Sequence, residues 1–128
     1  MAHIHPVAIY YEDTDLSGAV YHANYLRYFE VARVEWLRAR GVVYRDFEAQ
    51  GLALPVIEAN VRYRRSASYD DLLDVTCIPA LMRAASSRFE YRIHRDQELI
   101  AEGWTSHACI DRSGRPVRYP ESLRELLK

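Results

Sequence analysis

The chain has little of several features that mark whole classes of protein. Only two of its 128 residues are cysteines, Cys77 and Cys109, which are too few for a disulfide framework. Both lie in apolar segments, so we expect buried free thiols. No basic stretch followed by an apolar run opens the chain, and no apolar run approaches the roughly 18 residues that a transmembrane helix needs. These absences predict a cytoplasmic protein without a transmembrane segment.

The chain has almost no excess of positive or negative charge. The formal net charge is -1, which gives no general reason to expect binding to nucleic acid or to an anionic membrane surface. Hydrophobic residues make up 49% of the chain and charged residues 27%, as in an ordinary globular protein. A chain of this length typically forms one domain. We therefore expect a single domain over residues 1–128.

Motifs for metals and common cofactors are missing. The histidines do not pair at ligand spacing, since His3 and His5 lie at the start and His94 and His107 are far apart. No H-E-x-x-H, C-x-x-C, Walker A or G-x-G-x-x-G motif occurs, nor the G-x-S-x-G motif of serine hydrolases. We expect no metal site and no bound cofactor.

Hydrophobic periodicity predicts one long helix. Residues 7–11 are β-branched and aromatic, which is typical of a strand. Over residues 23–40 apolar side chains recur at helical spacing. The stripe consists of Tyr25, Phe29, Ala32, Trp36 and Leu37. Other sides of this segment are apolar too, which indicates a buried helix.

Strands dominate the chain after Gly51. Strand patterns cover residues 54–64, 72–81, 87–94 and 99–110, with turn residues between them, and short helices are expected at 44–50 and 120–127. Consecutive strands joined by short turns predict an antiparallel meander. A single sheet must bury the apolar helix against one face. The predicted fold class is therefore α+β, a hotdog fold in which an antiparallel sheet wraps around a long central helix.

The segment between the first strand and the long helix carries the candidate chemistry. Two aspartates, a glycine, a histidine and an amide crowd residues 11–25, although neither neighbouring element needs them for folding. Asp15 can attack an acyl carbon or accept a proton from water. Gly18 lets backbone approach a ligand closely. His22 can donate a hydrogen bond, and unpaired N–H groups at the helix start can hold an oxyanion.

Alternatives remain for each of these residues. Asp13 competes with Asp15 for the catalytic role, because both point the same way if the strand continues. Either aspartate could instead form a turn or cap a helix. Tyr11 is a third candidate catalytic residue, which lines the pocket or orients the carboxylate, unless it packs in the core. Asn24 is expected to cap the helix. Spacing alone does not choose between the two aspartates.

The segment strongly resembles the hotdog acyl-CoA thioesterases. The nearest group is the Tol–Pal-associated (YbgC-like) enzymes, which are related to 4-hydroxybenzoyl-CoA thioesterase. The match lies at fixed spacing on Tyr11, Asp13, Thr14, Asp15, Gly18, Val20, Tyr21, His22, Ala23, Tyr25, Tyr28, Phe29, Glu30, Ala32 and Arg33. Looser matches follow at Val61, Tyr63, Ala67, Asp70, Asp71 and Leu72, and around Arg83.

The resemblance implies roles that spacing leaves open. It implies that Asp15, not Asp13, is the catalytic carboxylate. It places the backbone N–H of His22 against the thioester carbonyl and Tyr11 at the wall of the site. Gly18 and Tyr25 become candidate substrate-binding residues. Active sites of this family lie at a dimer interface, so we expect a homodimer or a homotetramer.

A second cluster departs from the family pattern. Where the family strand often reads Arg-Gly-Thr-Ser, this chain has Arg83, Ala84, Ala85 and Ser86. Arg83 and Ser86 are retained, and with Arg88 they are candidate substrate-binding residues, because arginine matches the phosphates of coenzyme A. The alternative is that both arginines are solvated strand charges. Coenzyme A itself is part of the substrate and not a cofactor.

Two functions are therefore expected, and the presence of Asp15 helps to choose between them. The first is hydrolysis of an acyl-CoA or acyl-carrier-protein thioester, with Asp15 as nucleophile or general base. The second is a non-hydrolytic protein that binds such a thioester and presents it to a partner. Asp15 favours hydrolysis, because a binding protein has no need of it. A hydratase on the same fold needs a G-D-x-N-P-x-H motif, which is absent.

Overall fold

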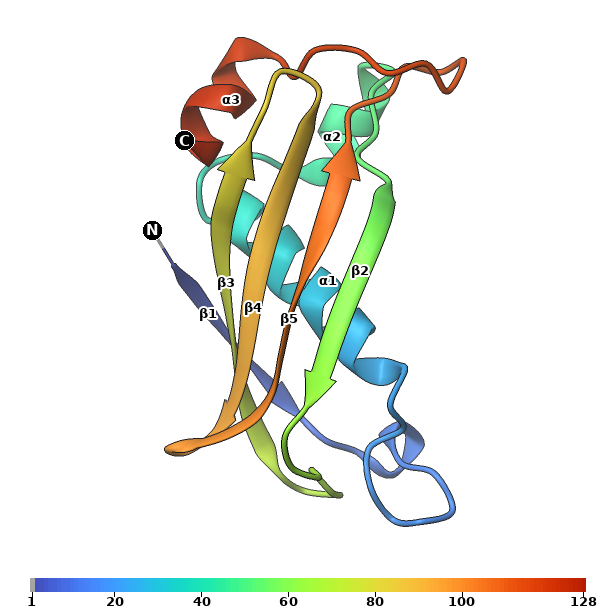
Figure 1. Ribbon diagram of the computed structural model, residues 1–128, viewed down its shortest axis with the longest axis vertical. Helices are drawn as coiled ribbons and strands as arrows, with labels where there is room; N and C mark the ends of the chain where they lie inside the picture. The colour runs from blue at the N-terminus through green and yellow to red at the C-terminus, as the bar shows by residue number, and fades with distance from the viewer. Residues whose placement is uncertain (1) are drawn as a thin grey trace.

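The computed structural model describes residues 2–128, and Figure 1 shows a long curved sheet with one long helix behind it. The elements follow the predicted order, strand, helix and then four strands. They are β1 (His3–Ala8), η1 (Tyr11–Asp13), α1 (Asn24–Arg38), α2 (Tyr44–Ala49), β2 (Val56–Tyr63), β3 (Leu72–Met82), β4 (Ser86–Arg95), β5 (Glu98–Ala108) and α3 (Glu121–Leu127). The predicted α+β hotdog fold is confirmed.

The sheet is antiparallel throughout, but its order is β1-β3-β4-β5-β2. The prediction of a simple meander is correct for β3, β4 and β5 and wrong for β2. Both edges of β3 are occupied, by β1 and by β4. Strand β2 therefore crosses to the free edge of β5, where Asn60 lies opposite Trp104. As a result β2 forms one edge of the sheet.

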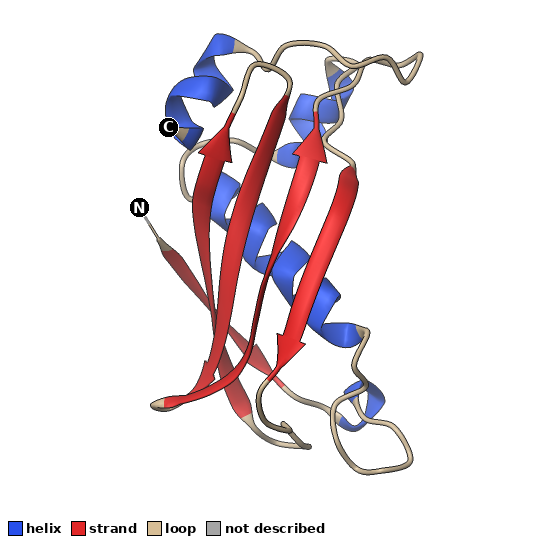
Figure 2. Ribbon diagram, viewed as in Figure 1, coloured by secondary structure: helices blue, strands red, loops and turns tan. Residues whose placement is uncertain are grey.

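Helix α1 covers one face of the sheet, as the blue helix behind the red strands in Figure 2 shows. All five residues of the predicted stripe are buried. Phe29 stacks on Tyr91 of β4 with ring centroids 4.3 Å apart, and Trp36 meets Phe89 edge-on at 5.6 Å. Aromatic pairs of this kind stabilise a core beyond their buried area. The opposite side of α1 is more open than expected, since Leu26 is 40% exposed.

Two glycines shape the ends and the crossing of these elements. Gly41 follows α1 with a φ of +85°, the left-handed conformation that commonly ends a helix. Gly103 of β5 lies where an added Cβ would be 1.9 Å from the carbonyl oxygen of Asn60 and 3.1 Å from the ring of Phe29. Its lack of a side chain lets β2 and α1 approach β5 closely.

Cys77 and Cys109 are both buried and free, as predicted. Within residues 2–128, no helix has the length and apolarity to cross a membrane.

Candidate active site

The loop between β1 and α1 is a compact structure with its own backbone hydrogen bonds. The 3-10 turn η1 opens it, and Thr14 then pairs with Val20 in an isolated bridge. Between these two residues the N–H of Gly18 donates to the carbonyl of Asp15 at 3.0 Å. Gly18 has a φ of +86° and no heavy atom within 4 Å of an added Cβ. The chain thus reverses sharply at Gly18 and leaves open space beside it.

Asp15 lies exposed at this reversal. Its Oδ1 accepts the Ser17 N–H at 2.8 Å and the Ser17 hydroxyl at 2.5 Å. Its Oδ2 accepts no hydrogen bond from residues 2–128. The pKa of Asp15 is lowered, first by the Ser17 hydroxyl, then by the Ser17 N–H, and also by the charge of His22. Asp15 therefore offers an ionised carboxylate with one oxygen fixed and one free.

Asp13 differs from Asp15 in its burial and in the hydrogen-bond partners of its carboxylate. It is 4% exposed, and its carboxylate accepts the Tyr10 N–H at 2.8 Å and pairs with the guanidinium of Arg27. The expectation that both aspartates point the same way is wrong, because η1 breaks the alternation of an extended strand. Of the two aspartates, only Asp15 presents its carboxylate to solvent.

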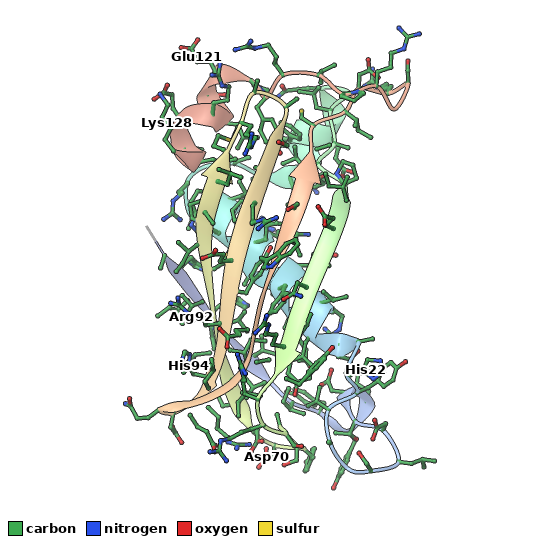
Figure 3. All side chains as sticks on the ribbon, in the orientation of Figure 1. His22, Asp70, Arg92, His94, Glu121 and Lys128 are labelled. Atoms are coloured by element: carbon green, nitrogen blue, oxygen red, sulfur yellow. The ribbon has the colours of Figure 1, made fainter. Side chains whose placement is uncertain are left out.

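His22 occupies the turn just before α1, where Figure 3 shows it at the beginning of the helix. The hydroxyl of Tyr63 donates to the His22 carbonyl at 2.9 Å. Among residues 2–128, neither the His22 N–H nor the Ala23 N–H donates a hydrogen bond. Free N–H groups at a helix start suit a negatively charged oxygen. Asn24 does not cap the helix as expected, because its side chain donates to the Asp13 carbonyl at 2.8 Å.

Two other candidates, Tyr11 and Tyr25, are held by contacts with other tyrosine rings. Tyr11 is 71% exposed and stacks on Tyr69, with ring centroids 3.7 Å apart. Tyr25 is 3% exposed and packs between Tyr28 and Tyr63. The structure therefore brings Asp15, Gly18 and His22 together on one loop and places Tyr25 in the core.

The second predicted cluster lies at the opposite end of the sheet. Arg83 lies in the turn between β3 and β4, and Ser86 begins β4, at the top of Figure 1, whereas the loop of Asp15 is at the bottom. Through Ala101 of β5, Tyr63 lies level with Ile93 of β4. Ile93 is seven residues after Ser86, which corresponds to about 23 Å along the strand. Arg88 lies over Trp104 at 3.8 Å and donates to Ser106. Within one chain these residues cannot share a small ligand with Asp15.

A cavity of about 290 Å³ opens between α1 and the start of β2. Its walls are mostly apolar, with a few polar groups, and consist of Glu30, Arg33, Val34, Leu37, Tyr44, Leu54, Pro55, Val56, Phe89 and His107. Two of these lining residues, Arg33 and His107, are joined by a chain of hydrogen bonds through the core: Arg33 to Tyr91 at 3.0 Å, Tyr91 to Thr105 at 2.6 Å, and Thr105 to His107 at 2.8 Å. Apolar pockets with few polar groups are typical of small-molecule sites.

Sequence reasoning missed residues that support the loop. Ser17 was not singled out, although an aspartate side chain commonly accepts the N–H two residues later in a turn. Tyr63 reaches His22 from a strand 41 positions later in the chain, and no local pattern indicates that contact. Among residues 2–128 no group of three or more metal-ligating side chains occurs.

Comparison with known proteins gives the family. The model of the thioesterase-like superfamily matches residues 10–127. The chain is 37% identical over 121 residues to a Haemophilus influenzae protein named acyl-CoA thioesterase YbgC, and the match covers 93% of this chain and 89% of that protein.

Solved structures agree with this match. A hypothetical protein from Thermus thermophilus superposes with a TM-score of 0.94 at 33% identity, covering 99% of this chain and 95% of that one. A DHNA-CoA thioesterase from Staphylococcus aureus superposes with a TM-score of 0.93 at 31% identity, covering 98% and 87%. The family resemblance seen in the loop is thereby confirmed, and the chain belongs to the thioesterase-like superfamily.

Proposed function

We propose that this protein hydrolyses acyl-CoA thioesters to a free acid and coenzyme A at the loop of Asp15. The observation that carries the proposal is that a carboxylate and free backbone N–H groups occur on one loop. An ionised carboxylate with one free oxygen lies on the same loop as the free N–H groups of His22 and Ala23. The relatives named acyl-CoA thioesterase and DHNA-CoA thioesterase support the same reaction.

In the proposed mechanism, the thioester carbonyl oxygen accepts hydrogen bonds from the N–H groups of His22 and Ala23. Either Oδ2 of Asp15 attacks the carbonyl carbon, or Asp15 takes a proton from a water molecule that attacks it. Negative charge develops on the carbonyl oxygen, where the two N–H groups stabilise it. The C–S bond breaks, and coenzyme A leaves as the thiolate. If Asp15 is the nucleophile, water then hydrolyses the mixed anhydride and restores the carboxylate.

We infer that the complete site needs a second copy of the chain. Strand β2 is an edge strand with exposed apolar side chains, Val56 at 47%, Ile57 at 56% and Tyr63 at 49%. Such edges are usually covered. If two β2 strands pair antiparallel about a two-fold axis, Val56 of one chain lies beside Tyr63 of the partner subunit. The 290 Å³ cavity of one chain then opens next to the partner's loop. Arg83 of the same chain as the cavity also approaches that loop.

This arrangement gives each candidate a place. The acyl group enters the cavity of one chain, the other chain's Asp15 acts on the thioester, and Arg83, Ser86 and Arg88 contact the coenzyme A portion. Acyl-carrier-protein thioesters would use the same loop. A homodimer is sufficient for this site, and a homotetramer is a pair of such dimers.

Turnover of an acyl-CoA panel tests the reaction. Release of free thiol is measured for wild type, Asp15→Asn and Glu12→Gln, which removes one exposed carboxylate from the same loop. We expect Asp15→Asn to lose at least about 10²-fold in kcat, and Glu12→Gln to match wild type. Equal rates for wild type and Asp15→Asn would refute the role of Asp15. Tight binding of acyl-CoA without thiol release would support the non-hydrolytic alternative.

Mixed oligomers test whether the site is shared. Asp15→Asn removes the carboxylate, and Val34→Trp fills the cavity. If each site uses the loop of one chain and the cavity of the other, mixing the two inactive variants at equal amounts restores about a quarter of wild-type activity. A site contained within one chain would show no recovery.

A further inference from the structure

Asp13 is the most highly connected residue of the loop, and the proposed mechanism does not use it. Its side chain is 5% exposed. One carboxylate oxygen accepts the Tyr10 N–H, and the other pairs with Arg27 of α1. Its carbonyl oxygen accepts the Tyr21 N–H at 2.9 Å and the Asn24 side chain at 2.8 Å.

These contacts tie three parts of the chain to one residue. Tyr10 is the last residue before η1, Tyr21 follows the bridge that closes the loop, and Asn24 with Arg27 forms the first turn of α1. The segment that carries Asp15 lies between the tied points. Asp15 is two residues after Asp13, and the His22 N–H directly follows Tyr21. The spacing between the free carboxylate oxygen and the free N–H groups thus depends on Asp13.

We propose that Asp13, held by Arg27, is a positioning residue that sets the Asp15 carboxylate against the N–H groups of His22 and Ala23. The proposal rests on the proposed function, since it takes Asp15 as the group that acts on the thioester. Asp13 itself cannot touch the substrate, because it is buried and both of its oxygens have partners. Misplacing a reacting group by about 1 Å can reduce a rate about 10²-fold.

The local packing fits a fixed point and not a mobile one. The hydroxyl of Tyr28 is buried and has no hydrogen-bond partner within residues 2–128. Its pKa is raised, mainly by burial and further by the nearby charge of Asp13. The Asp13 carboxylate is held by the Tyr10 N–H on one oxygen and by the Arg27 guanidinium on the other.

The variant Asp13→Asn tests the proposal, because it keeps the shape and removes the charge. We expect kcat for an acyl-CoA thioester to fall about 10²-fold while KM changes less than about threefold, since the cavity and the arginines are untouched. Asp111→Asn is the matched control. The Asp111 carboxylate also organises a turn, by accepting the N–H groups of Ser113 and Arg115, but at a distance from the loop. It should retain wild-type kcat.

Arg27 supplies a second variant in case Asp13→Asn does not fold. Arg27 is 55% exposed, so its replacement leaves the core intact. Arg27→Gln should lower kcat, and Arg27→Lys should retain most of the wild-type kcat. Arg38→Gln, which breaks the Arg38–Glu35 pair on the same helix, should leave kcat unchanged. A purely structural role would lower the melting temperature without this split between Gln and Lys. Wild-type kcat in both Asp13→Asn and Arg27→Gln overturns the proposal.

Amide hydrogen exchange separates this proposal from the proposed function. In Asp13→Asn, amides of residues 15–23 should exchange at least about tenfold faster than in wild type, while those of β4 and β5 do not change. If wild type hydrolyses no thioester, the proposed function fails, and exchange still tests the positioning. Unchanged exchange in the loop overturns the role of Asp13 whatever the activity is.

Discussion

The hydroxyl of Tyr63, the last residue of β2, donates a hydrogen bond of 2.9 Å to the carbonyl oxygen of His22. This bond links the edge strand of the sheet to the turn that precedes α1. The Tyr63 ring also packs edge-on against Tyr25, with centroids 5.3 Å apart. The orientation of the His22 backbone, and with it the direction of the free N–H groups, is therefore connected to the strand on which the partner subunit is proposed to pair.

Removing the Tyr63 hydroxyl should weaken catalysis. Tyr63→Phe keeps the ring and loses one half-exposed hydrogen bond, which contributes about 1 kcal/mol. We expect kcat/KM for an acyl-CoA to fall about fivefold and the melting temperature to fall by about 4 °C. Tyr69→Phe is the control, because Tyr69 is exposed and stacks on Tyr11 through its ring. Equal kcat/KM in wild type and Tyr63→Phe would contradict the link.

The pH dependence of the reaction should report the contact between Asp15 and Ser17. The Ser17 hydroxyl is the largest cause that lowers the pKa of Asp15. The proposed reaction needs the Asp15 carboxylate, so we expect activity to be lost as the pH falls through this pKa. Ser17→Ala removes the hydroxyl, so the pKa rises and the acid limb of the kcat/KM profile moves to higher pH. Ser17→Thr retains a hydroxyl and should keep the wild-type profile; an unshifted limb in Ser17→Ala would argue against Asp15 as the titrating group.

Local patterns predicted the parts of the fold that depend on local physics. The stripe that contains Phe29 and Trp36 is a property of helical spacing, and it indicated both the helix and its buried face. The pairing of β2 with β5 is a property of which strand edges remain free, and no stretch of sequence records it. Hence the elements were predicted well, while a four-strand meander was predicted in place of the observed order.

At the candidate site too, local patterns predicted some features, while features that depend on tertiary packing were missed. The crowding of polar residues marked the loop, and family resemblance chose Asp15 over Asp13. Strand parity failed there because a 3-10 turn at Tyr11–Asp13 breaks the two-residue alternation, and burial of Asp13 depends on Arg27, fourteen residues later. The contact from Tyr63 and the cavity beside Val34 arise from tertiary packing, which spacing cannot give.

Gly103 should tolerate no side chain. An added Cβ would overlap the carbonyl oxygen of Asn60 at 1.9 Å, and that oxygen belongs to backbone that cannot rotate away. Gly103→Ala must therefore push β2 or α1 off β5, at a cost of about 3 kcal/mol in the free energy of unfolding. Gly114→Ala is the comparison, since Gly114 has a φ of +82° and open space around it, and should cost about 1 kcal/mol. Equal losses in denaturant unfolding would mean that the close approach is relieved cheaply.

His107 should make the fold less stable as the pH falls. It is 1% exposed, and its Nδ1 donates to the Leu54 carbonyl at 3.1 Å while Nε2 accepts from the Thr105 hydroxyl. Burial, and next the charge of Arg33, lowers its pKa to about 4, whereas the unfolded chain has a histidine pKa of about 6.5. As the pH falls through 6.5, the unfolded state binds a proton that the folded state does not bind until about 4.

The lost stability across that window is about 3 kcal/mol. It should be absent from His107→Gln, which does not titrate, whatever the absolute stability of that variant. The measurement is the difference in unfolding free energy between wild type and variant at pH 7 and at pH 4.5. That difference shrinks with falling pH if His107 is neutral in the folded state. A constant difference for His107→Gln would show that His107 takes up a proton inside the fold.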